Sequence, residues 1–454
     1  MKKHRSSNHK KGSARNHQRK ISMTATTQEL TSQAGLLPVV KYLSRIGFEK
    51  TIQQSVPHQR GDNAEYQLTD VIQLTVVGMI GGAQSMAKVA SVWADAVLRK
   101  VAGWTRVPVE TTILRIFQEV SETQINQLES TNHQLRGRLW RQAIRAGVST
   151  VGIKPTQWVD VDSTVDSVCG QQEGSAKGYN PKQRGALAYH PQLAFLADSK
   201  EILQAWFRTG SAYTSNGIVE FTKQLLAHLP KRMRMVFRAD SGYFVGELMD
   251  LLDQRGHGYL IKVKLKNLVG LLSAQSWTAV VGQANWEQCE FDYACGGWTR
   301  TRRFVAVRVA KPKAIDSPQQ DFFATQEYDY FCYVTTEGLN PWQAHKKYGA
   351  RATCETWIEE AKRQMGLGKI RTASFLANAA LFHCAVLAYN LVRWMAMLSG
   401  NATLRRWEPE TIRTYLVRVA GKLLTGSKQL TVKTPDNHLY PKEWGDWVAV
   451  GLAA

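Results

Sequence analysis

The amino-acid sequence predicts an α/β protein: a mixed sheet flanked by helices, interrupted by an all-β insertion and preceded by an α-helical N-terminal domain. Helical patterns without strand-like alternation fill residues 29–150. Short β-branched segments then alternate with amphipathic segments from 151 to 263, as in sheets with crossover connections. Aromatic and polar residues alternate through 264–340, and Gly296-Gly297 marks a turn there, which is typical of strands.

The first element is a basic tail. Residues 1–20 contain eight Lys and Arg and no acid, and residues 1–28 have almost no large apolar side chains. Such a composition predicts disorder and non-specific contacts with phosphates. The chain as a whole carries 58 Lys and Arg against 37 Asp and Glu, a net charge of +21. This excess favours a polyanionic partner, nucleic acid or an anionic membrane surface, with a merely solubilising surface as the alternative.

Residues 151–263 have an ordered pattern of strands and helices. Its strand order with two late crossover helices predicts a mixed sheet. The expected strands are 157–162, 193–197, 202–208, 235–240 and 258–263, and the expected helices are 215–229 and 244–255.

The C-terminal third returns to helical periodicity. We expect helices within 343–366, 373–399 and 408–424. The domain boundaries that follow are a tail (1–28), a helical DNA-binding domain (29–150), a first core part (151–263), the insertion (264–340), a second core part (341–400) and a C-terminal helical region (401–454) with a possible dimerisation role.

Cysteine usage and apolar stretches indicate the compartment. Six scattered cysteines without a CxxC pair predict neither a zinc site nor a disulfide framework, as in a reducing compartment. The basic start is not followed by an apolar segment, so no signal peptide is expected. The apolar stretch 373–399 includes Asn378, His383 and Arg393, which predicts a buried helix and no membrane span. We therefore expect a cytoplasmic protein.

Two aspartates stand at the ends of predicted strands. Asp162 ends the first strand, and Asp240 ends the fourth, before Ser241-Gly242-Tyr243. Ligand sites of mixed α/β sheets form outside strand ends. Asp160 lies on the same strand face as Asp162, so either acid can point inward. A turn or capping role is the alternative for each.

A third acid is placed by helical geometry. With about 100° per residue, five polar residues fall within about 80° of arc on a helix through 343–366. They are Tyr348, Arg351, Glu355, Glu359 and Lys362, and the opposite side has Ala350, Cys354, Trp357 and Ala361. A solvated face with i,i+4 ion pairs is the alternative reading.

The spacing Tyr348-x2-Arg351-x3-Glu355-x6-Lys362 resembles the Y-x2-R-x3-E-x6-K signature of a large group of DDE insertion-sequence transposases. Asp162-Ser163-Thr164 resembles their D-x-T strand, and the block from Asp240 to Tyr243 resembles D-x-G-[FY]. The stretch 172–191 is similar to a branch with a KGYNP loop after the first acid block.

The resemblance implies an RNase H-like core in which Asp162, Asp240 and Glu355 are catalytic and hold two Mg²⁺ ions, with Mn²⁺ as a substitute. Two such ions activate the attacking oxygen and stabilise the leaving one. Asp160 and Glu359 remain alternatives for the first and third positions. Tyr348, Arg351 and Lys362 are expected to contact DNA phosphates.

The resemblance also implies partners and location. We expect double-stranded DNA, both element ends and target, bound by a homodimer in a synaptic complex, in the bacterial cytoplasm with the nucleoid and without a membrane. The alternatives are a DNA-binding protein without catalysis, such as a domesticated transposase, and an RNase H-like nuclease.

The insertion and the loop after the first acid supply further DNA-binding candidates. Six cations and no acid lie between Tyr293 and Ile315. Trp298 is a candidate for stacking on a flipped base, with a core aromatic as the alternative. The other candidates are Arg300, Arg302 and Arg303 of the insertion, and Lys177, Lys182 and Arg184 of the loop.

Overall fold

A five-stranded core lies at the centre of the protein. The computed structural model describes residues 22–452, apart from 59, 62, 149–153, 155, 179, 181–182 and 312–326. Most of the basic tail therefore lies outside the described residues. The core strands are β2 (Thr156–Ser163), β6 (Gln192–Leu196), β7 (Ile202–Trp206), β8 (Arg234–Ala239) and β9 (Gly258–Lys262).

The core topology confirms the predicted RNase H-like fold. The strand order is β7-β6-β2-β8-β9, in which β6 runs antiparallel to β2 and β7, while β2, β8 and β9 are parallel. The crossovers are α8 (Ile218–Ala227) and α9 (Gly246–Gln254). Parallel neighbours need such crossover connections, and each helix buries its apolar face on the sheet.

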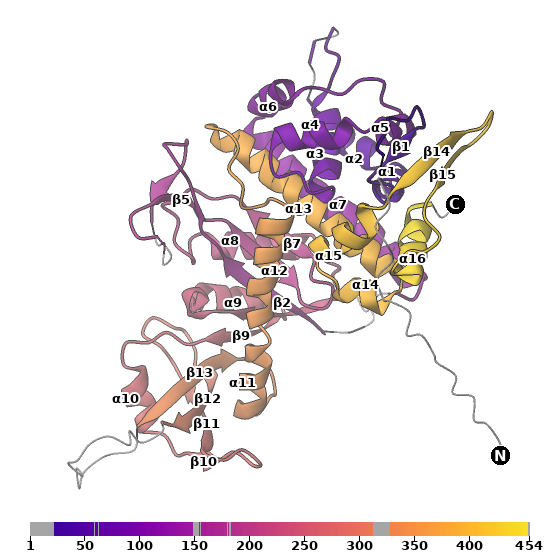
Figure 1. Cartoon of the computed structure of the whole chain (residues 1–454). Helices are drawn as coiled ribbons and strands as arrows, with labels where there is room; N and C mark the ends of the chain where they lie inside the picture. Colours follow the sequence, from indigo (N-terminus) through magenta and orange to yellow (C-terminus); the bar gives the residue numbers. More distant parts are fainter. Residues whose placement is uncertain are drawn as a thin grey trace, which may run out of the picture.

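The insertion continues the core sheet. Its strands are β10 (Thr278–Ala279), β11 (Trp286–Tyr293), β12 (Arg302–Ala310) and β13 (Tyr328–Thr335). The strand β13 pairs antiparallel with β9, so that nine strands form one sheet (Figure 1). The all-β expectation needs one correction, because the helix α10 (Leu268–Ser273) precedes the strands.

The single helix expected over 343–366 is wrong. The structure has α11 (Pro341–Gly349), a turn, α12 (Ala352–Glu359) and the π-helical turn η2 (Glu360–Gln364). Cys354, Trp357 and Ala361 are buried as expected, whereas Ala350 is exposed in the turn. The break lies at Gly349, and glycine is a poor residue for a helix interior.

The N-terminal helices and the C-terminal region form one body. The helices are α1 (Leu36–Arg45), α2 (Phe48–Ser55), α3 (Leu68–Ile80), α4 (Met86–Trp93), α5 (Ala96–Ala102), α6 (Glu110–Gln118), α7 (Glu122–Arg145), α13 (Phe375–Leu398), α14 (Ala402–Arg406), α15 (Pro409–Ile412) and α16 (Pro441–Leu452). Figure 1 shows α13 crossing between the N-terminal helices and the sheet.

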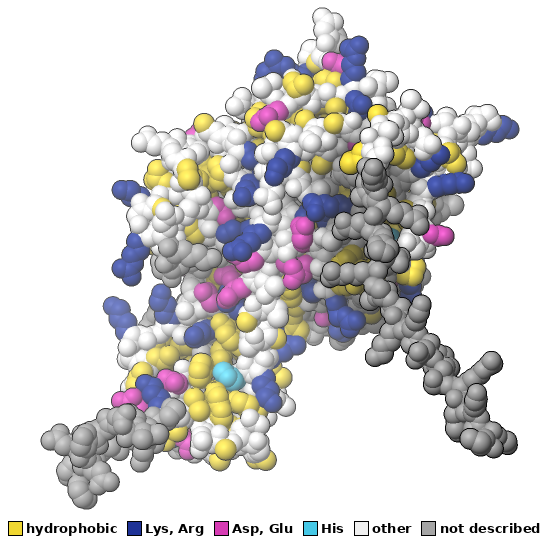
Figure 2. Space-filling view, viewed as in Figure 1, with side chains coloured by type: hydrophobic (Ala, Val, Ile, Leu, Met, Phe, Trp, Pro, Cys, Tyr) yellow, Lys and Arg dark blue, Asp and Glu magenta, His cyan; other side chains and the backbone are white. Residues whose placement is uncertain are grey.

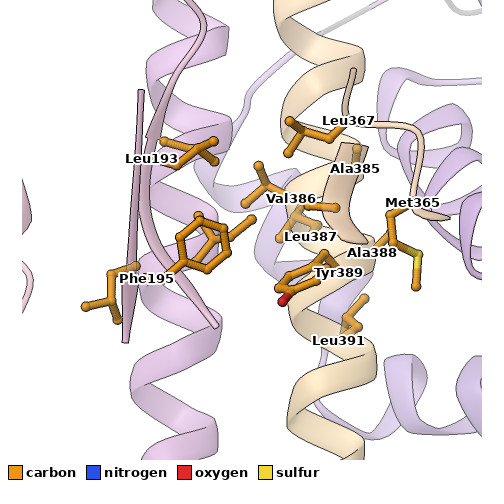
Figure 3. Packing of buried hydrophobic residues seen from close by; sticks show 14 of the residues in the cluster. Leu193, Phe195, Met365, Leu367, Ala385, Val386, Leu387, Ala388, Tyr389 and Leu391 are labelled. Atoms are coloured by element: carbon orange, nitrogen blue, oxygen red, sulfur yellow. The ribbon is translucent and has the colours of Figure 1, made fainter. Parts of the chain in front are cut away.

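The helix α13 is the central packing element. It contacts α3, α6 and α7 on one side and β7 on the other. Figure 3 shows its apolar side chains, among them Leu387 and Tyr389, facing Leu193 and Phe195 of β6. It is long and apolar enough to cross a membrane, but 89% of its most apolar window is buried inside the protein. The expected buried core helix is therefore what the structure contains.

The C-terminal region is not purely helical, which corrects the prediction for 401–454 and the helix expected over 408–424. The short π-helical turn η3 (Arg413–Val417) is followed by the hairpin β14 (Gly421–Thr425) and β15 (Leu430–Lys433). The strand β14 pairs with β1 (Leu30–Thr31), and α16 packs on α1. The two ends of the described chain are thus joined in one body.

A small sheet covers the edge of the core next to the first acid. It consists of β3 (Asp166–Ser167), β5 (Leu187–Tyr189) and β4 (Ala176–Lys177), in the order β3-β5-β4. The loop expected at 172–191 is therefore partly stranded.

Candidate active site

Parallel pairing places the two aspartates side by side. Val161 of β2 is in register with Ala239 of β8, so Asp162 and Asp240 follow at the same ends of neighbouring strands. Asp240 caps the next turn, because its Oδ1 accepts a hydrogen bond from the Gly242 amide at 2.9 Å. A Cβ on Gly242 would lie 2.8 Å from Thr214 Cγ2 and 3.0 Å from Asp240 Oδ1. Glycine at this position of the D-x-G-Y block therefore permits the close approach.

Asp160 belongs to a buried ion pair. Its two carboxylate oxygens accept hydrogen bonds from Arg238 Nε at 2.6 Å and Nη2 at 2.8 Å, and both side chains are almost fully buried. A third guanidinium hydrogen bond goes from Nη1 to the carbonyl oxygen of Lys347, next to Tyr348. Asp160 thus has both oxygens engaged away from the cavity, and this geometry favours Asp162 as the first acid.

Arg351, at the start of α12, links Glu355 of this helix to Asp162. The Arg351 guanidinium pairs with Asp162 Oδ2 at 2.6 Å and with Glu355 Oε1 at 3.3 Å. Glu359, one turn later, pairs with Arg363 at 2.7 Å. Glu355 therefore shares a guanidinium with Asp162, whereas the partner of Glu359 lies on its own helical segment. The segment that follows β2, residues 164–166, is called the strap below.

One cavity of about 650 Å³ collects these groups. Asp162, Asp240, Glu355 and Glu359 all line it. The remaining lining residues are Ser163, Thr164, Val165, Ser167, Asn180, His190, Thr214, Ile358, Lys362 and Arg363. Figure 2 shows Asp and Glu side chains gathered near the middle of this face, beside Lys and Arg side chains. The cavity lining thus combines four acids with two cations, Lys362 and Arg363.

Burial dominates the electrostatics of the first acid. Desolvation raises the pKa of Asp162 to about 7 although Arg351 opposes the shift, and the nearby charge of Asp240 raises it further. Carboxylates that repel one another in a shared, partly buried site are typical of metal and catalytic sites.

The donor set fits a hard divalent cation. Mg²⁺ prefers carboxylate oxygens, and four carboxylates border this cavity, those of Asp162, Asp240, Glu355 and Glu359. Among the described residues, no three His, Cys, Asp or Glu side chains are close enough to hold one ion together. Arg351 pairs with both Asp162 and Glu355, so its guanidinium competes with a cation for these oxygens.

The other signature residues lie deeper than expected. The Tyr348 ring packs on Tyr333 of β13 with 4.6 Å between ring centroids, and burial raises its pKa to about 12. The Lys362 ammonium is bound by the strap after β2, with its side chain 15% exposed. Arg363, which the sequence reasoning missed, has a side chain 78% exposed at the cavity rim.

The insertion candidates are engaged within the protein. Trp298 is half-buried, packs on Phe244 and Phe304, and lies under the Arg302 guanidinium at 5.1 Å. Arg300 and Arg302 form ion pairs with Asp250 and Asp253 of α9.

Arg303 likewise pairs with Glu290 and donates to the carbonyl oxygens of Glu337 and Leu339. This part of the insertion is thus neutralised by acids distant in sequence. Its geometry favours the core alternative for Trp298.

The loop candidates lie on the small sheet beside the cavity. Lys177 ends β4 and Arg184 precedes β5, and both are exposed, while Lys182 lies outside the described residues. The sequence reasoning also missed His190, whose Nε2 is 3.0 Å from Ser163 Oγ and whose Nδ1 is 2.5 Å from the Ala212 carbonyl oxygen. In the sequence, the only feature that pointed to His190 was its position just before a predicted strand.

Comparison with known proteins identifies the family. The model of the transposase DDE domain group 1 matches residues 13–450. No curated protein sequence matches this chain. The chain is similar to a piggyBac transposase in a synaptic complex with hairpin DNA, at 10% identity and a TM-score of 0.44 over 86% of this chain and 82% of that one. The family match extends over nearly the whole length, and the chain belongs to the transposase DDE domain group 1 family.

Proposed function

We propose that this protein binds the terminal inverted repeats of its own insertion sequence and catalyses Mg²⁺-dependent DNA cleavage and strand transfer. The observation that supports this most is the convergence of Asp162, Asp240 and Glu355 on one cavity, in a chain of the DDE transposase family. Double-stranded DNA is the proposed substrate, a homodimer the proposed working unit, and the bacterial nucleoid its proposed location.

The proposed roles of the three acids follow from their positions in the cavity lining. Two Mg²⁺ ions would supply activation of the attacking oxygen and stabilisation of the leaving oxygen, with Mn²⁺ as a substitute. Asp162, Asp240 and Glu355 are the residues that would hold them.

Arg351 and Arg363 are the cations suited to contact a phosphate. Arg351 keeps Asp162 and Glu355 close to each other, and Arg363 presents its guanidinium at the rim. A guanidinium binds a phosphate in bidentate fashion.

The test is cleavage of DNA that carries the element ends. Purified protein with Mg²⁺ should nick such DNA and release 3′-OH ends, and Asp162→Ala should bind the same DNA without cutting it. The matched control is Asp198→Ala, because Asp198 pairs with Lys154 at the surface, away from the cavity lining. This control should cut at the wild-type rate.

The outcomes separate the alternatives. Binding without cleavage by the wild-type protein would overturn the enzymatic claim and leave a DNA-binding protein. Preferential cleavage of an RNA–DNA hybrid over the terminal-repeat duplex would instead indicate an RNase H-like nuclease. Cutting by Asp162→Ala would remove Asp162 from the site.

A further inference from the structure

Lys362 makes an unusual set of contacts for a residue expected to bind phosphate. A lysine ammonium has three donors. The Lys362 ammonium donates hydrogen bonds to Thr164 Oγ1 at 2.8 Å and to the Val165 carbonyl oxygen at 2.9 Å, and it forms an ion pair with Asp166 Oδ1 at 2.9 Å. These partners are consecutive residues of the strap, the segment that follows β2. A phosphate contact would have to displace at least one of these partners.

The partner acid is more buried than the lysine. The Asp166 side chain is only 1% exposed, and its Oδ2 has no hydrogen-bond partner among the described residues. A buried carboxylate without the cation would be costly, because its charge would be desolvated and uncompensated. The ion pair is therefore a fixed contact of the fold, unlike a mobile surface pair.

A third segment closes over the pair. Gly368 lies where a Cβ would be 3.0 Å from Asp166 Oδ1 and 3.0 Å from Lys362 Cε. The contact thus joins the strap after β2, the π-helical turn η2 and the turn at Gly368 in close packing. π-helical turns are frequently found at functional sites.

The contact links the two halves of the proposed metal site. Thr164 and Asp166 come two and four residues after Asp162, and Lys362 comes seven residues after Glu355. Asp162 and Glu355 belong to segments about 190 residues apart in sequence, and Arg351 joins the two acids directly. The contact of Lys362 with the strap is a second link between these segments. Of the signature residues, Lys362 makes the contact that ties helix to strand without touching either acid.

We propose that Asp166 is a positioning residue: it holds Lys362, and this clamp fixes the segment after Glu355 against the segment after Asp162, an arrangement on which metal binding by the two acids depends. The proposal rests on the proposed function and adds to it a residue outside the three acids. It also assigns the signature lysine an internal role instead of a phosphate contact.

The experiment compares Asp166→Asn, Lys362→Met and the double variant in the full-length protein. Mn²⁺ binding without DNA is measured by electron paramagnetic resonance, and binding of end-containing DNA without metal is measured by fluorescence anisotropy at several salt concentrations. The rate at which each variant cleaves end-containing DNA with Mg²⁺ is the third measurement. Asp198→Asn is the matched control, and thermal melting reports on folding.

We expect Asp166→Asn and Lys362→Met each to lower the Mn²⁺ affinity and the cleavage rate by about 10–100-fold, as is found for other residues that support metal ligands. The double variant should lose no more than either single one, because both remove the same contact. DNA affinity and its salt dependence should stay at the wild-type level.

A different pattern would overturn the proposal. If Lys362→Met weakens DNA binding and reduces the salt slope by about 0.9, the lysine contacts a phosphate. Unchanged Mn²⁺ affinity in Asp166→Asn would equally refute the clamp.

Thr164→Val is a milder variant for the case that Asp166→Asn does not fold. It removes one acceptor without changing charge and should lower Mn²⁺ affinity by a smaller factor; wild-type affinity would count against the clamp. Absence of DNA cleavage by the wild type would refute the proposed function, while the Mn²⁺ measurements would still decide the clamp.

Discussion

Replacement of Asp160 tests which of two neighbouring aspartates is structural. Asp160 has no exposed surface and Arg238 is 3% exposed, and two hydrogen bonds of 2.6 and 2.8 Å join them. Asp160→Asn keeps the shape but removes the charge, so the guanidinium is left buried without its counter-ion. Breaking a buried pair in this way costs about 3–5 kcal/mol.

That cost is a large part of the stability of a typical protein, about 5–15 kcal/mol in total. We therefore expect Asp160→Asn to lower the urea midpoint strongly. Asp162→Asn, two residues along the same strand, should lower the midpoint much less, because Arg351 keeps Glu355 as a second partner. The double variant Asp160→Asn/Arg238→Met should recover much of the loss, because no uncompensated charge remains.

Urea denaturation followed by tryptophan fluorescence measures these differences at pH 8 without metal. If Asp160→Asn and Asp162→Asn had the same small effect, below about 1 kcal/mol as for exposed pairs, the reasoning about the buried pair would be wrong.

Three further predictions concern the site and the insertion. Burial raises the pKa of Asp162 from 3.8 to about 7, so the folded state binds more protons than the unfolded state in this window. The unfolding free energy contributed by this group therefore falls as the pH rises between these values. Burial also raises the pKa of Glu129 to about 8, so Asp162→Asn should keep part of the loss. Denaturation at pH 5 and pH 8 in EDTA should show a smaller loss in Asp162→Asn than in the wild type, and equal pH dependence would contradict the prediction. Trp298→Ala should destabilise the protein by about 3 kcal/mol, the lower end of the range for truncation of a tryptophan, because the ring is half-buried. Urea denaturation measures this loss. Unchanged stability together with lost DNA binding would instead support a stacking role for Trp298. Arg302→Met should cost about 1–3 kcal/mol, because the charged hydrogen bonds of this buried guanidinium are lost while Arg300 still pairs with Asp250 and Asp253. The more exposed Arg300→Met should cost below about 1 kcal/mol. Anisotropy should show an unchanged salt slope of DNA binding for both variants, and a reduced slope would show that they contact phosphates.

Local pattern was sufficient where a residue's environment follows from its own segment. The alternation of 157–162 and the apolar run of 373–399 predicted a strand and a buried helix, and both exist because each buries the face that its sequence makes apolar. The signature spacing likewise indicated the acids that line the cavity.

Local pattern failed where partners come from afar. The cations around Trp298 read as a nucleic-acid surface because the acids that neutralise them, Asp250 and Asp253, lie about fifty residues earlier on α9. The hairpin of β14 and β15 was missed because its first strand pairs with Leu30–Thr31 at the other end of the chain.

The sequence by itself indicated Asp162, Asp240 and Glu355 as candidate metal ligands, because the motifs that carry them depend on residue type and spacing, which are local properties. Only the tertiary structure separated Asp160, which is buried in an ion pair, from Asp162, which lines the cavity. Asp160 and Asp162 share a strand face, and periodicity cannot separate them. Arg238 and Arg351, brought in from other segments, bury the first in an ion pair and leave the second at the cavity.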